Sequence, residues 1–270
     1  MPDIYASITG ADPATLERLS AALELRAADL LRRGILKDFV SEINLPNEAK
    51  VLEIGCGTGA VTRFLVDLPQ VSQAIGIDPS PVFVAKAREL AEQVQNLTFQ
   101  EGDGRSLTYC EDRSFDAVLF HTTLCHIPKP EQALSEAMRV LRPRGCLAIF
   151  DGDYASVSVA TGNFDPLQCC ADAAIDGLVY DRWLLRRLSM MLSTAGFEAP
   201  RSRSYGYTSL PDPSYMFTLV DRGADLLLSA GRIGPEMADA LKAEARRRTE
   251  IDQFYGLIVF ASTVARKPGP

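Results

Sequence analysis

The sequence has few histidines, no paired-cysteine motif and no excess of positive charge. Each of these absences argues against one class of binding site. Its 270 residues include two histidines and six cysteines, and no two cysteines have the C-x-x-C spacing. A zinc-ribbon or zinc-finger site is therefore not expected, and we predict no bound metal. Acidic residues outnumber basic ones by 35 to 28, for a formal net charge of −7. Because phosphate-binding surfaces need clustered Lys and Arg, we expect no nucleic-acid partner.

Long apolar runs are also missing. No segment approaches the ~18 consecutive apolar residues that a membrane-spanning helix needs. The acidic N-terminus lacks the charged-then-apolar layout of a signal peptide. We therefore expect a cytoplasmic protein with no membrane partner and with reduced, mostly buried cysteines. The one basic cluster, Arg246–Arg248, predicts a solvated helix face in preference to an anion site. The oligomeric state stays open, a homodimer included.

What the sequence does contain is a short apolar strand that leads into a glycine-rich loop. Residues 51–54 form the strand, Gly55, Gly57 and Gly59 follow at alternate positions, and residues 60–68 have the pattern of a helix. Glycines at such a place let a ligand lie against the main chain beside a helix N-terminus. The loop alone is a weak signal, because the letters GCGTGA also satisfy the dinucleotide-binding fingerprint.

Strands and helices alternate from this loop to residue 151. The pattern predicts strands at 50–54, 73–77, 97–100, 115–120 and 146–150, with helices at 60–68, 81–95 and 130–140. Such alternation is typical of a Rossmann-like, doubly wound α/β fold whose parallel sheet has helices on both faces. N-cap and first-turn signals, Asp12-Pro13 and Ser80-Pro81, begin the helical segments at 12–40 and 81–95.

The pattern changes after residue 151. A helix at 181–196, strands at 202–210 and 254–265, and two helices between them suit an antiparallel addition to the sheet, which gives seven strands with a reversed last strand. We therefore divide the chain into an N-terminal helical cap, a core, a lid or acceptor loop region, and a C-terminal part of the core with a helical insertion at 211–250. Their bounds are 1–44, 45–151, 152–180 and 181–270.

Three carboxylates lie within or directly after the first three predicted strands, at positions where they can contact a bound nucleoside. Asp78 ends the second strand about twenty residues past the loop, where it can accept hydrogen bonds from ribose hydroxyls. Asp103 lies in E-G-D-G after the third strand, beside the expected position of an adenine edge, although a plain turn also suits it. Glu53 is a charge within an apolar strand, so it needs loop amides or a ligand ammonium as its partner.

These motifs together resemble those of the class I S-adenosylmethionine-dependent methyltransferases, over about residues 45–151. The segments that carry the resemblance are VLEIGCGTG, AIGIDPS, FQEGDGRSL and FDAVLFHTTLCHIPKPEQALSEAMRVLRPRGCLAIFD. The most similar group is methyltransferase type 11, which resembles the ubiquinone and menaquinone biosynthesis enzymes and acts on small molecules. The strand pair within 201–265 fits the family's reversed final strand. Arg144 stands where the family usually has glycine.

The resemblance implies S-adenosylmethionine as the cofactor and assigns residues to it. Gly55, Gly57 and Gly59 would lie under its methionine part, Glu53 would order the loop and the cofactor's amino group, and Asp78 would bind the ribose. Further contacts are implied for Cys56, Pro79, Gly102, Asp103, Gly104, His121 and Thr122. Because the cofactor carries the reactive methyl group, the protein's task is to align the acceptor and exclude water.

Candidate catalytic residues are few. His121 and His126 follow the fourth strand and Asp151 follows the fifth, at the sheet edge where such folds bind ligands. Each also has a structural explanation, which is favoured for His126. We expect the acceptor pocket to be lined by Tyr5, by residues of the segment from Tyr154 to Tyr180, and by Tyr205, Tyr207, Tyr215, Met216 and Phe217. These side chains favour a small, largely apolar acceptor. The acceptor atom stays open among O, N and C, and secondary metabolism is one setting that fits.

Other functions fit part of the pattern. An NAD(P)-dependent oxidoreductase explains the loop and Asp78, but it leaves Asp103 and the reversed strand unexplained, and no Tyr-x-x-x-Lys pair is present. A non-catalytic protein that binds S-adenosylmethionine explains the same motifs without turnover. A third alternative is this fold turned to a different reaction.

Overall fold

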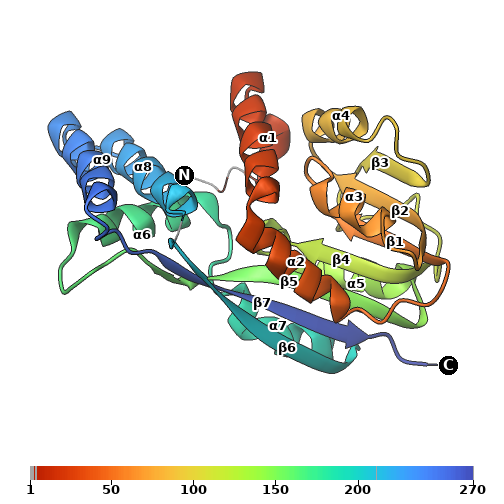
Figure 1. Cartoon of the computed structure of the whole chain (residues 1–270). Coiled ribbons are helices and arrows are strands. Elements are labelled where there is room, and N and C mark those ends of the chain that lie inside the picture. Colours follow the sequence, from red (N-terminus) through yellow and green to blue (C-terminus); the bar gives the residue numbers. More distant parts are fainter. Residues whose placement is uncertain (1–2, 4, 211, 270) are drawn as a thin grey trace.

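A seven-stranded sheet forms the centre of the computed structural model, which describes residues 3, 5–210 and 212–269 (Figure 1). The strands are β1 (Ala49–Ile54), β2 (Val71–Asp78), β3 (Leu97–Glu101), β4 (Phe115–His121), β5 (Leu141–Ser158), β6 (Glu198–Thr208) and β7 (Leu257–Arg266). Their order in the sheet is β3-β2-β1-β4-β5-β7-β6. The first five strands run parallel, and β7 is antiparallel to both β5 and β6. The predicted fold class, with its reversed last strand, is confirmed.

Helices surround the sheet and extend beyond one end of it. They are α1 (Pro13–Ala28), α2 (Leu30–Ser41), α3 (Ala60–Val66), α4 (Pro81–Leu90), α5 (Pro130–Val140), α6 (Pro166–Leu178), α7 (Leu184–Thr194), α8 (Ser214–Ser229) and α9 (Pro235–Glu250). Figure 1 shows α1 standing between α3 and α4 on one side and the group of α6, α8 and α9 on the other. None of the helices within the described residues is both long enough and apolar enough to span a bilayer.

The predicted helix starts at Asp12 and Ser80 are confirmed, whereas the N-terminal helical segment is divided at a place the pattern did not indicate. Asp12 accepts a hydrogen bond from the Thr15 N–H at 3.0 Å, and Ser80 caps α4. Asp29 interrupts the segment, and its carboxylate caps α2 by accepting the Arg32 N–H at 2.8 Å. The same N-cap chemistry that begins a helix therefore also ends its predecessor.

Strand β5 is longer than the pattern predicts. We expected it to end near residue 150, with a lid loop over 152–180, but it continues to Ser158 and is followed by α6. The extension pairs with β7, for example Gly152 with Phe260 and Asp153 with Val259. A neighbouring strand therefore overrides the poor strand propensity of Gly and Asp. At the other end, Arg144 has a φ of 66° in an irregular stretch, a left-handed conformation in which glycine is usual.

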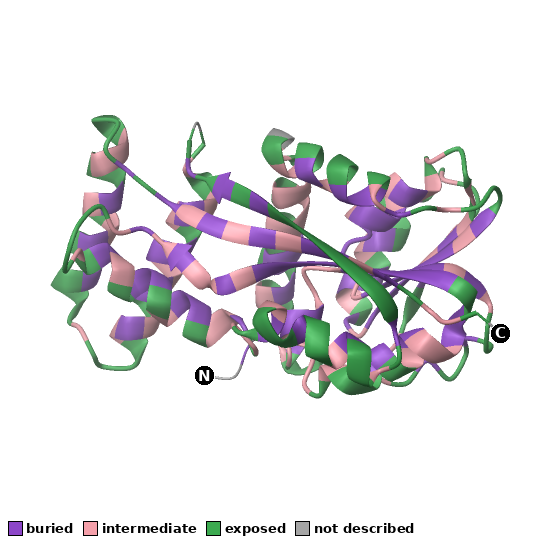
Figure 2. Cartoon of the chain, turned by 90° about the horizontal axis from the view of Figure 1, so that it is seen from below, coloured by how far each residue is buried: buried purple, intermediate pink, exposed green. Residues whose placement is uncertain are grey.

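The core lies on both faces of the central strands. Leu52, Phe120 and Ile149, on β1, β4 and β5, are fully buried. Figure 2 shows buried residues along these central strands, while the outer strand β6 is exposed over most of its length. Strands that are buried on both faces are typical of parallel sheets covered by helices. This arrangement leaves the carboxyl ends of the strands as the place where loops can form a site.

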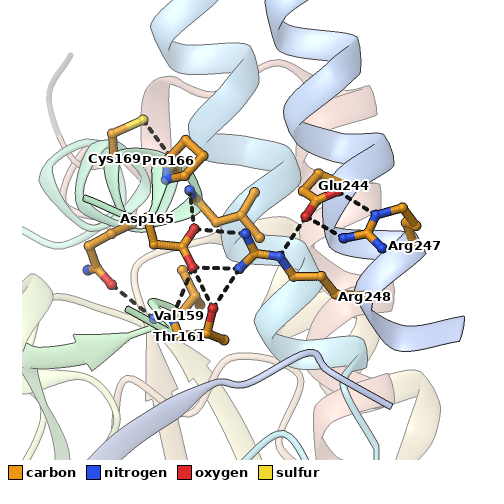
Figure 3. Close-up of polar contacts among 10 residues, drawn as sticks. Val159, Thr161, Asp165, Pro166, Cys169, Glu244, Arg247 and Arg248 are labelled. Atoms are coloured by element: carbon orange, nitrogen blue, oxygen red, sulfur yellow. Dashed lines mark hydrogen bonds and ion pairs between the residues drawn. The ribbon is translucent and has the colours of Figure 1, made fainter. Parts of the chain in front are cut away.

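A buried ion pair fastens the helical insertion to the rest of the chain (Figure 3). Arg248 of α9 contacts Asp165, the N-cap of α6, with 2.5 Å between Nη1 and Oδ2, and the two side chains are 13% and 3% exposed. The expected solvated face is therefore wrong for Arg248, although Arg246 and Arg247 are half exposed. Because α9 also packs on α8, this pair helps to hold α8 in place.

Candidate functional site

A cavity of about 490 Å³ lies at the carboxyl ends of β1, β2 and β4 and is also lined by α1 and α2. Its position is where doubly wound sheets bind ligands, and its volume suits a small molecule. The predicted cofactor residues that line it are Glu53, Gly55, Cys56, Gly57, Asp78, Pro79, Asp103, Gly104, His121 and Thr122. Gly59 and Gly102 were also predicted but do not line it.

The three loop glycines all need a left-handed backbone, but they serve different neighbours. Their φ angles are 73°, 53° and 79° for Gly55, Gly57 and Gly59. A Cβ on Gly55 would lie 2.0 Å from Thr123, and one on Gly59 would lie 2.4 Å from Phe99. A Cβ on Gly57 would point across the cavity, 3.1 Å from Leu23 of α1. Gly57 is therefore the glycine whose bare backbone keeps the cavity open, and the other two allow close packing.

The amide groups at the start of the loop are already engaged within the chain. The N–H groups of Gly55 and Cys56 donate to the carbonyl oxygen of Ile77 at 2.7 and 3.0 Å. The Gly57 N–H donates to Asp78 Oδ2 at 2.8 Å. A loop that cradles a pyrophosphate offers free N–H groups to it. This geometry therefore disfavours a dinucleotide and suits a ligand without phosphates.

Two buried carboxylates face this cavity. Asp78 accepts the Ser80 N–H at 2.9 Å in addition to that of Gly57, and burial raises its pKa to about 6. Glu53 accepts a hydrogen bond from Thr62 Oγ1, and burial raises its pKa to about 8. Each carboxyl group can lose its proton when a cationic ligand enters, because an adjacent positive charge favours the ionised form. This part of the cavity wall therefore favours a cationic ligand.

Asp103 is held by its neighbour Arg105. Its carboxylate accepts the Arg105 N–H at 2.8 Å and the guanidinium at 2.6 to 3.0 Å, and these bonds lower its pKa. The carboxylate still lines the cavity beside Gly104. Its acceptor positions are largely used, so an adenine amine would have to share them with Arg105.

His121 lies at the end of β4 with its ring stacked on Phe150, the centroids 4.9 Å apart. Burial, with the positive charges of Arg32 and Arg26, lowers its pKa to about 3. The imidazole is therefore neutral and a weak base near neutral pH. The next residue, Thr122, has a φ of 51°, a strained conformation for a β-branched residue that lines the cavity.

His126 and Asp151, the other two catalytic candidates, make hydrogen bonds that shape the loop. His126 Nδ1 lies 2.7 Å from Asp3 Oδ2, which also accepts the Tyr180 N–H at 2.8 Å. Asp151 is fully buried and accepts the Cys125 N–H at 3.1 Å. His126 lines the cavity, whereas Asp151 does not. Asp151 therefore supports the loop after β4 from beneath.

A second cavity, of about 730 Å³, adjoins the first and is lined from α1, α2, α6, β6 and α8. Among the aromatic residues expected around an acceptor, those that line it are Tyr5, Tyr154, Tyr207 and Tyr215. Tyr205, Met216 and Phe217 were expected there too but pack elsewhere in the core. Residues that line both cavities are Tyr5, Arg26, Ala28, Arg32 and His126. This shared wall makes the two cavities neighbouring parts of one site.

Arg26 and Arg32 are site residues that the sequence pattern did not reveal. Single arginines in a helical segment usually mark a solvated face, and nothing in their spacing distinguishes these two. The described residues contain no group of three or more His, Cys, Asp or Glu that could hold a metal ion.

Comparison with known proteins agrees with the geometry. Residues 52–149 match a type 11 family model described as a methyltransferase domain. The thiol S-methyltransferase TMT1B of Rattus norvegicus is 32% identical over 108 residues, which cover 39% of this chain and 43% of the relative. The chain spans about half or less of the length of the curated relatives it matches, for example 45%, 42% and 43% of three of them.

Solved structures share the fold over most of the chain. A presumed methyltransferase from Bacillus halodurans C-125 has a TM-score of 0.60 at 22% identity, covering 86% of this chain and 98% of its own. The phosphoethanolamine N-methyltransferase 2 of Haemonchus contortus, solved with S-adenosylhomocysteine, has a TM-score of 0.56 at 17% identity, covering 87% and 52%. Sheet order, glycine loop and matched domain therefore agree: the chain carries the methyltransferase domain of the class I S-adenosylmethionine-dependent methyltransferases.

Proposed function

We propose that this protein transfers a methyl group from S-adenosylmethionine to a small, largely apolar acceptor. The observation that carries the proposal is the pairing of a glycine loop with engaged amides and two buried carboxylates, Glu53 and Asp78, in one cavity. A cationic nucleoside without phosphates suits such a wall better than a dinucleotide does. A second cavity shares a wall with the first and offers room for an acceptor.

The residues of the first cavity fit the parts of this cofactor. Asp78 can accept from the ribose hydroxyls with its remaining lone pairs, and Glu53 lies where an ammonium would stabilise its ionised form. Gly57 leaves the main chain bare beside them, while Asp103 and Gly104, which line the same cavity, would border the base. When bound, the cofactor supplies a methyl carbon that is already a strong electrophile.

The chain's own contribution is then position and exclusion of water. His121 and Thr122 end β4 at the cavity wall, and α1 covers the glycine loop through Leu23. The low pKa of His121 makes it a poor proton acceptor. These features favour an acceptor atom that is nucleophilic without prior loss of a proton. The named relatives act on different acceptors, so no acceptor identity is taken from them.

A titration and a transfer assay test this proposal. Calorimetry should show binding of S-adenosylmethionine and S-adenosylhomocysteine, and none of NADH. A mass-spectrometric screen of small-molecule extracts, with the cofactor carrying a deuterated methyl group, should then show a labelled product. Binding of NADH alone would support the oxidoreductase alternative. Cofactor binding without any labelled product across the extracts would contradict turnover and support a non-catalytic binder or a different reaction.

A further inference from the structure

Two partly buried arginines, Arg26 and Arg32, lie on the wall shared by the two cavities. Arg26 is on the last turn of α1 and Arg32 is on the first turn of α2, so they flank the helix break at Asp29. Both line the first and the second cavity. His121, at the carboxyl end of β4, lines the first cavity together with them, and their charges add to burial in lowering its pKa.

Arg32 has a cation–π environment but an unused donor. Its Cζ lies 4.2 Å from the ring centroid of Tyr215 and 5.0 Å from that of Tyr207. Its Nη2 is buried and has no hydrogen-bond partner among the described residues. The carboxylate of Asp29 accepts the Arg32 backbone N–H and the Tyr207 hydroxyl instead. A buried donor without a partner is costly, so it is a position that a ligand acceptor can satisfy.

Arg26 also lacks a side-chain partner among the described residues, although it is only partly buried. No hydrogen bond or ion pair joins its side chain to the described part of the chain, although it lines both cavities. Burial opposes its charge, but Tyr5, Tyr215 and Tyr154 around it raise its pKa, so the guanidinium stays charged. Tyr215 is thus close to both arginines, which brings the two charges toward the same part of the wall.

Two carboxylates in the second cavity, Asp29 and Asp212, offset this pair only in part. Their hydrogen bonds come from neutral donors such as Ser214, which do not cancel a negative charge. A third arginine, Arg222 of α8, also lines the cavity, so three arginines face two aspartates. The acceptor side of the site is therefore positive, whereas the buried carboxylates Glu53 and Asp78 make the other side acidic.

We propose, on the basis of the proposed function, that the methyl acceptor is a flat apolar acid whose carboxylate binds Arg26 and Arg32. Its apolar body lies against Tyr154, Tyr207 and Tyr215 in the second cavity. Two guanidinium forks match the planar pair of carboxylate oxygens, and the aromatic wall excludes competing water. Arg32 also lies over Phe260 of β7, with 5.2 Å to the ring centroid, which is the side of the sheet away from β2 and the ribose position.

A binding comparison between an acid and its neutral amide tests this proposal. With saturating S-adenosylhomocysteine, phenylacetate should bind about tenfold tighter than phenylacetamide in calorimetric titrations. Arg26→Met and Arg32→Met should each remove that preference, because methionine keeps much of the apolar stem but no charge. The matched control is Arg18→Met, an exposed arginine on α1 whose loss should leave the preference intact.

Several outcomes would overturn the proposal. Equal binding of acid and amide by the wild type, or no binding of the acid in the millimolar range, would do so. Tighter binding of phenyl phosphate than of phenylacetate would overturn the choice of carboxylate. Loss of S-adenosylhomocysteine affinity in Arg32→Met would place that guanidinium on the cofactor. If Arg32→Met does not fold, Arg32→Lys replaces it, and the proposal then requires a weakened preference because lysine keeps the charge without the fork.

The same titrations distinguish a failure of the proposed function from a failure of the proposed acceptor class. A wild-type protein that does not bind S-adenosylhomocysteine contradicts the methyltransferase activity, whatever the acid does. A wild-type protein that binds it and treats acid and amide alike contradicts only the assignment of the acceptor class.

Discussion

The two cavities of this protein lie side by side but are assembled differently. The first includes short continuous segments at the ends of parallel strands, at 53–58, 78–79, 103–104 and 121–123, which residues of α1, α2 and α3 complete. The second takes single residues from many places, such as Tyr5, Tyr154, Tyr207 and Arg222. A site at strand ends is encoded in continuous stretches of sequence, whereas a site between helices depends on how those helices are placed against one another.

The two cavities also differ in charge. Buried carboxylates, Glu53 and Asp78, belong to the first, and two arginines, Arg26 and Arg32, lie on the wall that it shares with the second. An acidic wall next to a basic one suits a cationic cofactor beside an anionic acceptor. The predictions below test whether the two walls act independently.

The largest effect is expected from filling the cavity at the glycine loop. Gly57→Val places a branched side chain on a backbone with φ of 53°, where the Cβ alone approaches Leu23 to 3.1 Å. Affinity for S-adenosylhomocysteine, measured by calorimetry, should fall by more than about 100-fold. Gly206→Val on the exposed side of β6 is the control, because nothing lies within 4 Å of its added Cβ. Retained affinity in Gly57→Val would remove this cavity as the cofactor site.

A smaller but large effect is expected at the carboxylate that ends β2. Asp78→Ala removes the predicted ribose acceptor and also the acceptor of the Gly57 N–H. S-Adenosylhomocysteine affinity should weaken by ~1–3 kcal/mol. Binding of phenylacetate to the second cavity should weaken much less if the walls are independent. An affinity for the cofactor equal to that of the wild type would refute the role of Asp78.

The pH dependence of the first cavity follows from its raised pKa values. The pKa is about 6 for Asp78 and about 8 for Glu53. Both carboxyl groups therefore lose their protons as the pH rises from about 5.5 to about 8.5, and the cavity wall gains negative charge. Affinity for cationic S-adenosylmethionine should rise over this range. Glu53→Gln should remove the part of the rise above pH 7. A flat profile in the wild type would contradict ionisation of these groups on binding.

The same raised pKa makes the free protein less stable at high pH. Folded Glu53 keeps its proton up to about pH 8, whereas the unfolded chain loses it near the ordinary value of 4.5. Because the folded state then binds more protons, stability falls as pH rises between these values. Thermal unfolding of Glu53→Gln should show a weaker decline over that window than the wild type does.

The smallest effect is expected at the loop that borders both cavities. His126 and Asp3 form one contact, so His126→Gln and Asp3→Asn should each lower the melting temperature by about 2–4 °C, with little further loss in the double variant. Methyl transfer by the folded His126→Gln protein should persist. A variant of normal stability that has lost turnover would instead assign His126 to the chemistry.

The glycine loop, the strand alternation and Asp78 could be predicted because each depends on local geometry. A left-handed backbone requires glycine, and a carboxylate that directly follows a parallel strand must lie at the ligand edge. The extension of β5 could not be predicted, because its partner β7 is more than a hundred residues away along the chain. Asp151 shows the same limit. It follows the predicted strand at 146–150, which suggested a ligand contact, but it lies within the longer β5 and accepts the Cys125 N–H instead.

By itself the sequence determined the fold class, the cofactor edge and the residues whose conformation or position admits few alternatives. Only the tertiary structure decided that Arg26 and Arg32 are enclosed between α1, α2, β6 and α8, and that Arg248 is buried against Asp165. The physical reason is that the environment of a charged side chain depends on which elements pack around it. The sequence of a helix does not show whether an arginine on it contacts water, a carboxylate or a cavity.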